Sequence, residues 1–160
     1  NGAKVLKASI LSQSPVDHVL IMLGTNDLKS RFNRDTFSIA QGLEQLGNIV
    51  KQTKAGIGSW NDEFSPNLSI ISPLVLGDLS KDKNWNNSPT LNYNEWEGAF
   101  EKSKKLSVDI KSMCEKNKFH YIDGNIYTRS SLKDPIHWEK KSHRIFGEAI
   151  AKTLINEIFY

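Results

Sequence analysis

The stretch that decides the fold is Val-Leu-Ile-Met-Leu-Gly-Thr-Asn-Asp-Leu, residues 19–28. An apolar run of strand length ends abruptly in four turn-forming residues, 24–27. An almost wholly apolar run of this kind is typical of a strand that is covered on both faces of a parallel sheet. Because ligands bind outside the carboxyl ends of such strands, the pattern predicts an α/β fold with a polar site here.

The rest of the chain alternates strand-like and helix-like segments, which is the pattern of βαβ units. We predict strands over 16–23, 68–72 and 119–122. We predict helices over 3–13, from a cap at Asn33 or Asp35 to Gly56 and Gly58, over 93–117, and from about 140 to 158. A long irregular segment, 73–91, precedes the third helix, and loops of that length often cover a substrate.

Apolar residues at helical spacing predict which helix faces are buried. These are Phe37, Ala40, Leu43, Leu46 and Val50 in the second helix, Trp96, Phe100, Leu106, Ile110 and Met113 in the third, and Ile145, Phe146, Ala149, Ile150 and Leu154 in the last.

Length and composition are those of an ordinary globular protein. The 160 residues are 38% apolar and 24% charged, so we expect one domain over 1–160 with a sizeable core. No apolar run approaches the length of a membrane span, and no secretory segment opens the chain. The single cysteine, Cys114, fits a reducing compartment and a buried apolar position, so a cytoplasmic location is expected.

The net charge of +3 and the pI near 8.9 raise the question of nucleic-acid binding. In the third predicted helix, however, the lysines alternate with acidic residues, which indicates a solvated face. The residues concerned are Lys102, Lys104, Lys105, Lys111, Lys116 and Lys118, with Glu101, Asp109 and Glu115. We therefore expect neither a nucleic-acid partner nor a membrane partner.

Asp134-Pro135-Ile136-His137 places an acid three residues before an imidazole. Ester hydrolysis by a serine needs an imidazole that accepts the hydroxyl proton and a carboxylate that orients this imidazole. The alternative is that Asp134 is a turn residue and His137 a partly exposed loop histidine. Because this spacing is common by chance, the alternative is favoured for the motif in isolation.

Asn26 follows the first predicted strand directly. A side-chain amide in this place can donate a hydrogen bond to the oxyanion of a tetrahedral intermediate. The alternative is that Asn26 and Asp27 cap the following turn. For Asp27 we favour that structural role.

Together, in this order and context, the two motifs resemble sequence blocks of the SGNH (GDSL-type) hydrolases. Gly24-Thr25-Asn26-Asp27 is similar to the family's Gly-x-Asn-Asp block, and Asp134 to His137 to its Asp-x-x-His block. The string over 21–29 resembles the arylesterase and acyltransferase-like branch. The resemblance covers the whole chain, but the Gly-Asp-Ser block that carries the nucleophile is not among these residues.

The resemblance implies a flavodoxin-like three-layer α/β/α sandwich whose five parallel strands follow the order 2-1-3-4-5, with the last three present here. It implies that Asn26 is an oxyanion donor, His137 the general base and Asp134 its orienting acid, with Gly24, Thr25 and Asp27 supporting the turn. The nucleophilic serine and an oxyanion glycine would then lie upstream of residue 1, since Gly2 is too close to the first helix. The first strand would have an open edge in such a truncated chain.

The expected activity is therefore that of a serine esterase that cleaves short acyl or acetyl esters through an acyl-enzyme, without cofactor or metal. The small-molecule ester would be its partner, and residues 1–160 alone would be nearly inactive. A different reading is a non-catalytic α/β binding module or a degenerate relative.

Other candidate residues have weaker support for a role in chemistry. Gly77-Asp78-Leu79-Ser80 imitates a nucleophile block, but its spacing and position are wrong, and a surface turn is the better interpretation of Ser80. The four histidines show no metal-ligand spacing. Trp60, Trp85 and Trp96 fit a substrate pocket or, for at least two of them, core packing.

Overall fold

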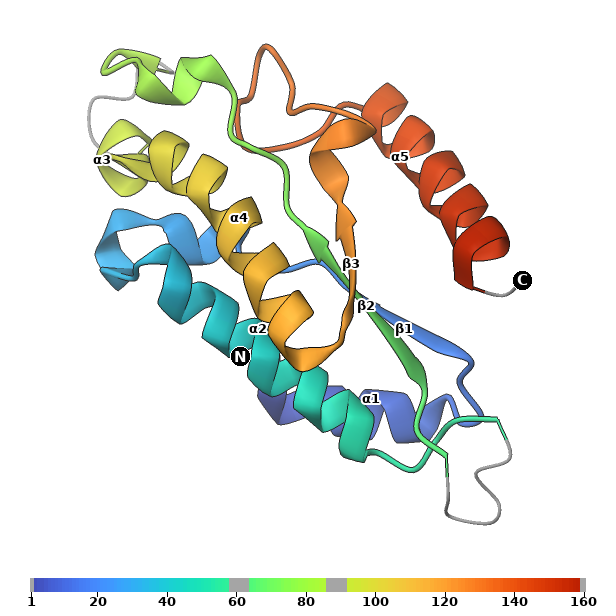
Figure 1. Ribbon diagram of the computed structural model, residues 1–160. Helices are drawn as coiled ribbons and strands as arrows, with labels where there is room; N and C mark the ends of the chain where they lie inside the picture. The colour runs from blue at the N-terminus through green and yellow to red at the C-terminus, as the bar shows by residue number, and fades with distance from the viewer. Residues whose placement is uncertain (1, 58–63, 86–91, 159–160) are drawn as a thin grey trace.

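A computed structural model describes residues 2–57, 64–85 and 92–158, and its centre is a parallel sheet (Figure 1). The strands are β1 (His18–Ile21), β2 (Asn67–Ser72) and β3 (His120–Asp123), in the order β1-β2-β3. In register, Val19 of β1 lies beside Leu68, and Ile70 of β2 lies beside Tyr121. The strands are therefore spatial neighbours in chain order, as predicted.

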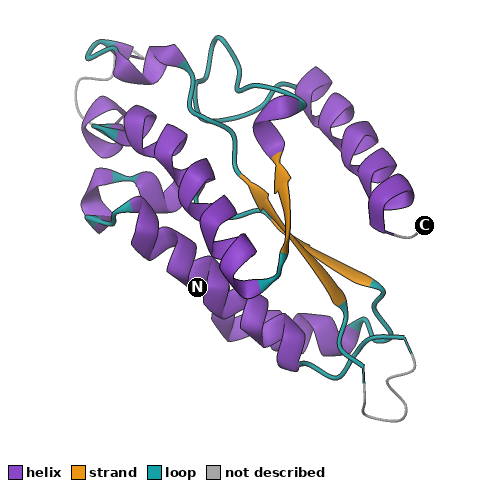
Figure 2. Ribbon diagram, in the orientation of Figure 1, coloured by secondary structure: helices purple, strands orange, loops and turns teal. Residues whose placement is uncertain are grey.

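Helices cover the sheet on both faces (Figure 2). They are α1 (Ala3–Ser12), α2 (Thr36–Gln52), α3 (Asn92–Trp96), α4 (Ala99–Asn117) and α5 (Lys140–Thr153), with a π-helical continuation η7 (Leu154–Ile158) and short 3-10 turns η1 (Thr25–Leu28), η2 (Ser30–Phe32), η4 (Asp78–Lys81) and η6 (Gly124–Ile126). The helices α1, α2 and α4 lie on one face, and α5 lies on the other. The predicted three-layer α/β fold with a parallel sheet is confirmed.

The core consists of two parts because successive residues of a strand point to opposite faces. On the face of α2 and α4, Ile70 packs with Val50, Leu106 and Ile110, all fully buried. On the α5 face, a smaller cluster joins Ile71, Ile122, Phe146 and Ile150. As the central strand, β2 is buried along nearly its whole length.

The edge strand β1 departs from the prediction in two ways. It is shorter than 16–23, and it is not covered on both faces: Leu20 is 39% exposed and Leu23 is 49% exposed. Within the described residues β1 pairs only with β2, and α5 packs on residues of β2 and β3. One side of β1 is consequently left open.

Two predicted core residues are exposed, and the reason is helical geometry. Phe37 is 61% exposed because it lies about 120° around α2 from the centre of the stripe that includes Leu43 and Val50. Ile145 is 40% exposed because it is about 100° away from its buried neighbour Phe146. The buried stripe of α5 is therefore narrower than predicted, because it excludes Ile145.

The helix predicted over 93–117 is interrupted. Gly98 adopts a left-handed conformation with φ 71° and separates α3 from α4. Asp35 caps α2 as predicted, with its Oδ1 accepting from the Ser38 amide at 2.7 Å. That helix ends at Gln52, before Gly56, while Gly58 lies outside the described residues.

A partly buried chain of polar side chains crosses all three strands. The hydroxyl Oγ of Ser69 on β2 lies 2.8 Å from Nε2 of His18 and 2.8 Å from Nδ1 of His120. Ser69 is fully buried. Burial lowers the pKa of His18, and repulsion from His120 and Lys51 lowers it further.

Cys114 is completely buried, and burial raises the pKa of its thiol to about 12. It is thus a small apolar core residue, as predicted, and not a nucleophile. In the described part of the chain, no helix combines the length and the apolar character needed to cross a membrane.

Candidate active site

The turn that carries Asn26 is fixed by packing. Gly24 has φ 122°, a conformation that other residues rarely adopt, and a Cβ added there would meet Ile39 at 3.2 Å and Leu106 at 3.3 Å. The turn η1 follows directly and ends in Leu28, which is 0% exposed. Glycine is therefore required at the point where the chain leaves β1.

The Asn26 side chain is exposed at this turn. Among the described residues, neither Asn26 nor Asp27 uses its side chain in a hydrogen bond, so the interpretation of these residues as turn caps is wrong. The Asn26 amide is consequently available to donate to a bound ligand.

The segment after the turn is tied to α3, which sequence reasoning missed. Ser30 Oγ donates to the Asn94 carbonyl at 2.6 Å, and the Glu95 carboxylate lies 3.2 Å from Lys29 Nζ and 2.8 Å from Arg31 Nη1. Lys29 also lies over the ring of Trp96, 5.0 Å from its centre. No local pattern in the sequence marks these long-range contacts.

The acid and the imidazole are in direct contact. His137 Nδ1 lies 2.6 Å from Asp134 Oδ2, and Asp134 Oδ1 accepts from the amides of Ile136 at 2.9 Å and of His137 at 3.2 Å. Partial burial raises the pKa of Asp134, but the hydrogen bonds from the His137 ring and from these two amides outweigh it, so the pKa is lowered. The carboxylate thus stays ionised and holds the ring with Nε2 directed away.

This turn is anchored on the 73–85 segment through a buried proline. Pro135 is fully buried, and its carbonyl accepts from the Gly77 amide at 2.9 Å. A Cβ at Gly77 would lie only 3.0 Å from Pro135 Cβ. The false nucleophile block therefore supports the acid–imidazole turn.

Ser80 itself is 2% exposed, and its Oγ donates to the Gly77 carbonyl at 2.7 Å. It lies in η4 and not on a surface turn, which corrects the predicted environment. A hydroxyl that is buried and committed to a backbone acceptor cannot attack an ester.

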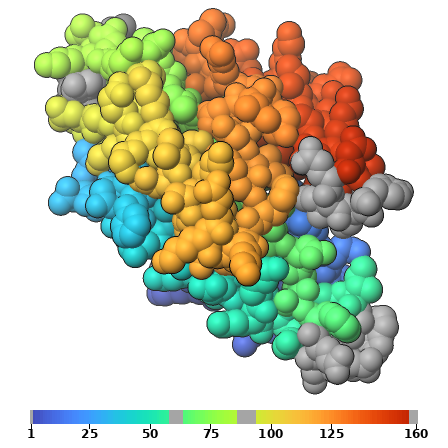
Figure 3. All heavy atoms as spheres, viewed as in Figure 1, coloured from blue at the N-terminus to red at the C-terminus, as the bar shows by residue number. Residues whose placement is uncertain are grey.

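The two motifs lie at the same edge of the sheet. Because the strands are parallel and adjacent, the turn after β1 and the loop after β3 both extend from the carboxyl end of the sheet (Figure 1). In the space-filling view, the loop after β3 is exposed between the 73–85 segment and α5 (Figure 3). The His137 side chain is 78% exposed there.

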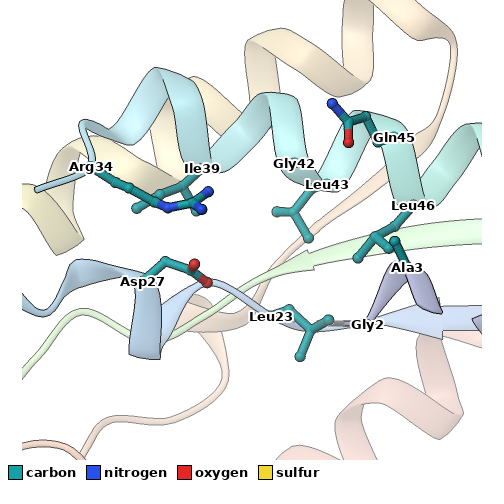
Figure 4. Close-up of a pocket in the computed structure, with 11 residues that line it drawn as sticks. Gly2, Ala3, Leu23, Asp27, Arg34, Ile39, Gly42, Leu43, Gln45 and Leu46 are labelled. Carbon is teal, nitrogen blue, oxygen red and sulfur yellow. The ribbon is translucent and has the colours of Figure 1, made fainter. Parts of the chain in front are cut away.

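A pocket of about 380 Å³ adjoins the Asn26 turn. Leu23, Leu43 and Leu46 line its apolar part (Figure 4). Asp27 and Arg34 lie at the same end of the pocket. Asp27 thus lines a cavity next to the candidate oxyanion donor.

Trp85 and Trp96 are each 5% exposed and belong to the core, as predicted for at least two tryptophans. Trp60 lies outside the described residues. Within the described ranges, no three His, Cys, Asp or Glu side chains are grouped so that they would hold a metal ion.

The sequence matches no protein-family model and no curated protein at a significant level. Solved structures do share the fold. The native aryl esterase of M. smegmatis is 26% identical with a TM-score of 0.84, and Est24, a carbohydrate acetylesterase from Sinorhizobium meliloti, is 29% identical with a TM-score of 0.82. Each alignment covers 97% of this chain and 67% of the other chain. These two esterases are therefore about half as long again as this chain.

Proposed function

We propose that this chain carries the base, the orienting acid and an oxyanion donor of an SGNH-type serine esterase that acts on short acyl or acetyl esters. The observation that carries the proposal is the 2.6 Å contact between His137 Nδ1 and Asp134 Oδ2 at the sheet edge where Asn26 exposes its amide. The esterase activities of the structural neighbours support the same reaction class.

The residues suit one sequence of steps. Nε2 of His137 takes the proton from a serine hydroxyl as its oxygen attacks the ester carbonyl carbon. The Asn26 amide donates to the oxyanion that forms. When the intermediate collapses, the C–O bond breaks, His137 returns the proton to the departing alcohol, and an acyl-enzyme remains. Water then attacks it by the same route.

The nucleophile is proposed to lie upstream of residue 1. Ser80, the one local imitation of a nucleophile block, is buried and bonded to Gly77. The neighbours are longer than this chain, which covers 67% of their length. Among the described residues β1 is an edge strand that pairs only with β2, which is consistent with a further strand, ending in Gly-Asp-Ser, on its other edge.

The test compares residues 1–160 with a form extended by the sequence encoded upstream, using p-nitrophenyl acetate. We expect fast turnover only in the extended form, because removal of the nucleophile leaves residual catalysis. In the extended form, Asn26→Ala should lower kcat by about 10²–10³ fold, the usual loss of an oxyanion donor.

Ser12→Ala, which removes an exposed hydroxyl of α1, is the control and should leave kcat unchanged. Ser80→Ala should leave the extended form active. If the 160 residues alone turn over rapidly and Ser80→Ala abolishes this, the assignment of the nucleophile is wrong. An extended form without any esterase activity would favour the non-catalytic module. The extended form should also melt at a higher temperature, since an uncovered apolar edge strand favours aggregation.

A further inference from the structure

Ser131 makes an unusual set of contacts with the loop that carries the acid and the imidazole. Its amide donates to the His137 carbonyl at 3.0 Å, and its Oγ donates to Glu139 Oε1 at 2.9 Å. The same Oγ accepts from the amides of Lys133 at 3.1 Å and Asp134 at 3.4 Å. One residue thus contacts the chain at both ends of the Asp134–His137 turn.

The hydrogen-bonding capacity of this hydroxyl is fully used. A serine hydroxyl has one donor and two acceptor positions, and here the donor goes to Glu139 while both acceptor positions receive backbone amides. Glu139 is the residue directly before α5. By accepting the hydroxyl hydrogen, its carboxylate turns the lone pairs of Ser131 toward the turn.

The imidazole depends on this support because little else holds it. The His137 side chain is 78% exposed, and its ring nitrogen Nδ1 is bonded to Asp134. The Asp134 side chain is itself 46% exposed. The direction of the ring therefore follows from the backbone of residues 131–137, which Gly77 holds at Pro135 and Ser131 holds at its two ends.

We propose that Ser131, oriented by Glu139, is a positioning residue that fixes the Asp134 carboxylate against Nδ1 of His137. The inference rests on the proposed function for its catalytic meaning. In physical terms, Ser131 determines that Nδ1 of the His137 ring carries the hydrogen, so that Nε2 remains the proton acceptor.

The test uses ¹⁵N NMR of the His137 ring in residues 1–160, at a pH where the ring is neutral. In the wild type, the Nδ1–H form should predominate because Asp134 accepts that hydrogen. Ser131→Ala should move the ratio toward the Nε2–H form by about threefold or more, as expected from losing much of one hydrogen bond. Ser131→Thr, which keeps the hydroxyl, should restore the wild-type ratio.

Ser142→Ala is the matched control, because within the described residues the one hydrogen bond of Ser142 Oγ goes to the Arg129 carbonyl, at 3.4 Å. Glu139→Ala should shift the ratio less than Ser131→Ala, and Glu139→Gln, which keeps an acceptor oxygen, should shift it least. If Ser131→Ala lowers the melting temperature but leaves the tautomer ratio unchanged, Ser131 is only structural and the proposal is wrong.

This experiment is independent of esterase activity. A shifted ratio in a protein whose extended form is inactive would retain the positioning role and reject the proposed function. An unchanged tautomer ratio in an extended form that is active would reject the positioning role and retain the proposed function.

Discussion

The two halves of the candidate site are held in place by different forces. The Gly24–Leu28 turn is fixed by shape: Gly24 has no room for a side chain, and Leu28 is completely buried. The 131–139 loop is fixed by polar contacts, with Asp134 and Ser131 each making several hydrogen bonds.

This difference matches what each half is proposed to do. An oxyanion donor works best when it is preorganised and does not move, which dense packing provides. An acid–imidazole pair must accept and return a proton, and its exposed polar environment allows the charge to change. We therefore expect the turn to respond to changes in volume, and the loop to changes in polarity and pH.

The largest effect should follow Leu28→Ala. Leu28 is 0% exposed, so the substitution should lower the free energy of unfolding by about 3 kcal/mol through lost burial and a cavity. Urea denaturation measures this change. Ile136→Ala in the loop removes a partly buried side chain and should cost about half as much or less. Equal losses would contradict the contrast between the two halves.

Gly24→Ala comes next, at about 2 kcal/mol, because it adds backbone strain at φ 122° to contacts with Ile39 and Leu106. Gly98→Ala is the control: Gly98 also has a positive φ, 71°, but a Cβ there meets nothing within 4 Å. Its cost should be about 1 kcal/mol, from strain alone. If both substitutions cost the same, packing does not fix the turn.

Ser80→Ala tests the hydrogen-bonded support under the loop and should cost about 1 kcal/mol, because the Gly77 carbonyl loses its buried donor. Ser12→Ala is the comparison, since Ser12 makes the same kind of contact, to the Ser9 carbonyl, on an exposed surface. Chemical denaturation of both variants should show almost no loss for Ser12→Ala. A similar loss in both would mean that burial of the Ser80 contact adds nothing.

The smallest effect concerns acid. The folded state lowers the pKa of Asp134 below 3.8, so the unfolded chain binds this proton more readily. The stabilisation is therefore complete above that value and is lost as the pH falls through the folded pKa. Asp134 is partly exposed, so the change should be well under about 1 kcal/mol. Urea midpoints between pH 5 and about 2.5 should fall less steeply in Asp134→Asn than in the wild type. Parallel slopes would contradict the prediction.

Apolar periodicity and turn chemistry predicted the alternating strands and helices of a parallel α/β fold and the residues that flank the sheet edge. The three layers and the strand order were implied by the resemblance to the SGNH hydrolases. Apolar periodicity placed Phe37 and Ile145 wrongly because spacing rules accept any residue near a stripe, whereas the angle around the helix decides burial. It missed the break at Gly98, since a single glycine inside a helical pattern is ambiguous.

For the candidate site, the sequence identified Asn26, Asp134 and His137 but not their supports. Gly77, Ser131 and Glu95 act through contacts between segments far apart in the chain or across a loop, and no local pattern marks such partners. The prediction that β1 is covered on both faces was wrong for a similar reason, because an apolar run does not reveal how many neighbours a strand has.

The polar chain through His18, Ser69 and His120 has a consequence for proton counting. The Ser69 hydroxyl carries one hydrogen. It can therefore donate to the imidazole of only one of His18 and His120, and it must accept from the other. The two rings are therefore locked in opposite roles, and a change of tautomer on β1 requires a matching change on β3. One additional proton, on the ring that already donates, leaves both contacts to Ser69 intact, whereas a proton on each ring would direct two N–H groups at the Ser69 oxygen. The protonation states of the side chains on the three strands are thus coupled through the Ser69 hydroxyl.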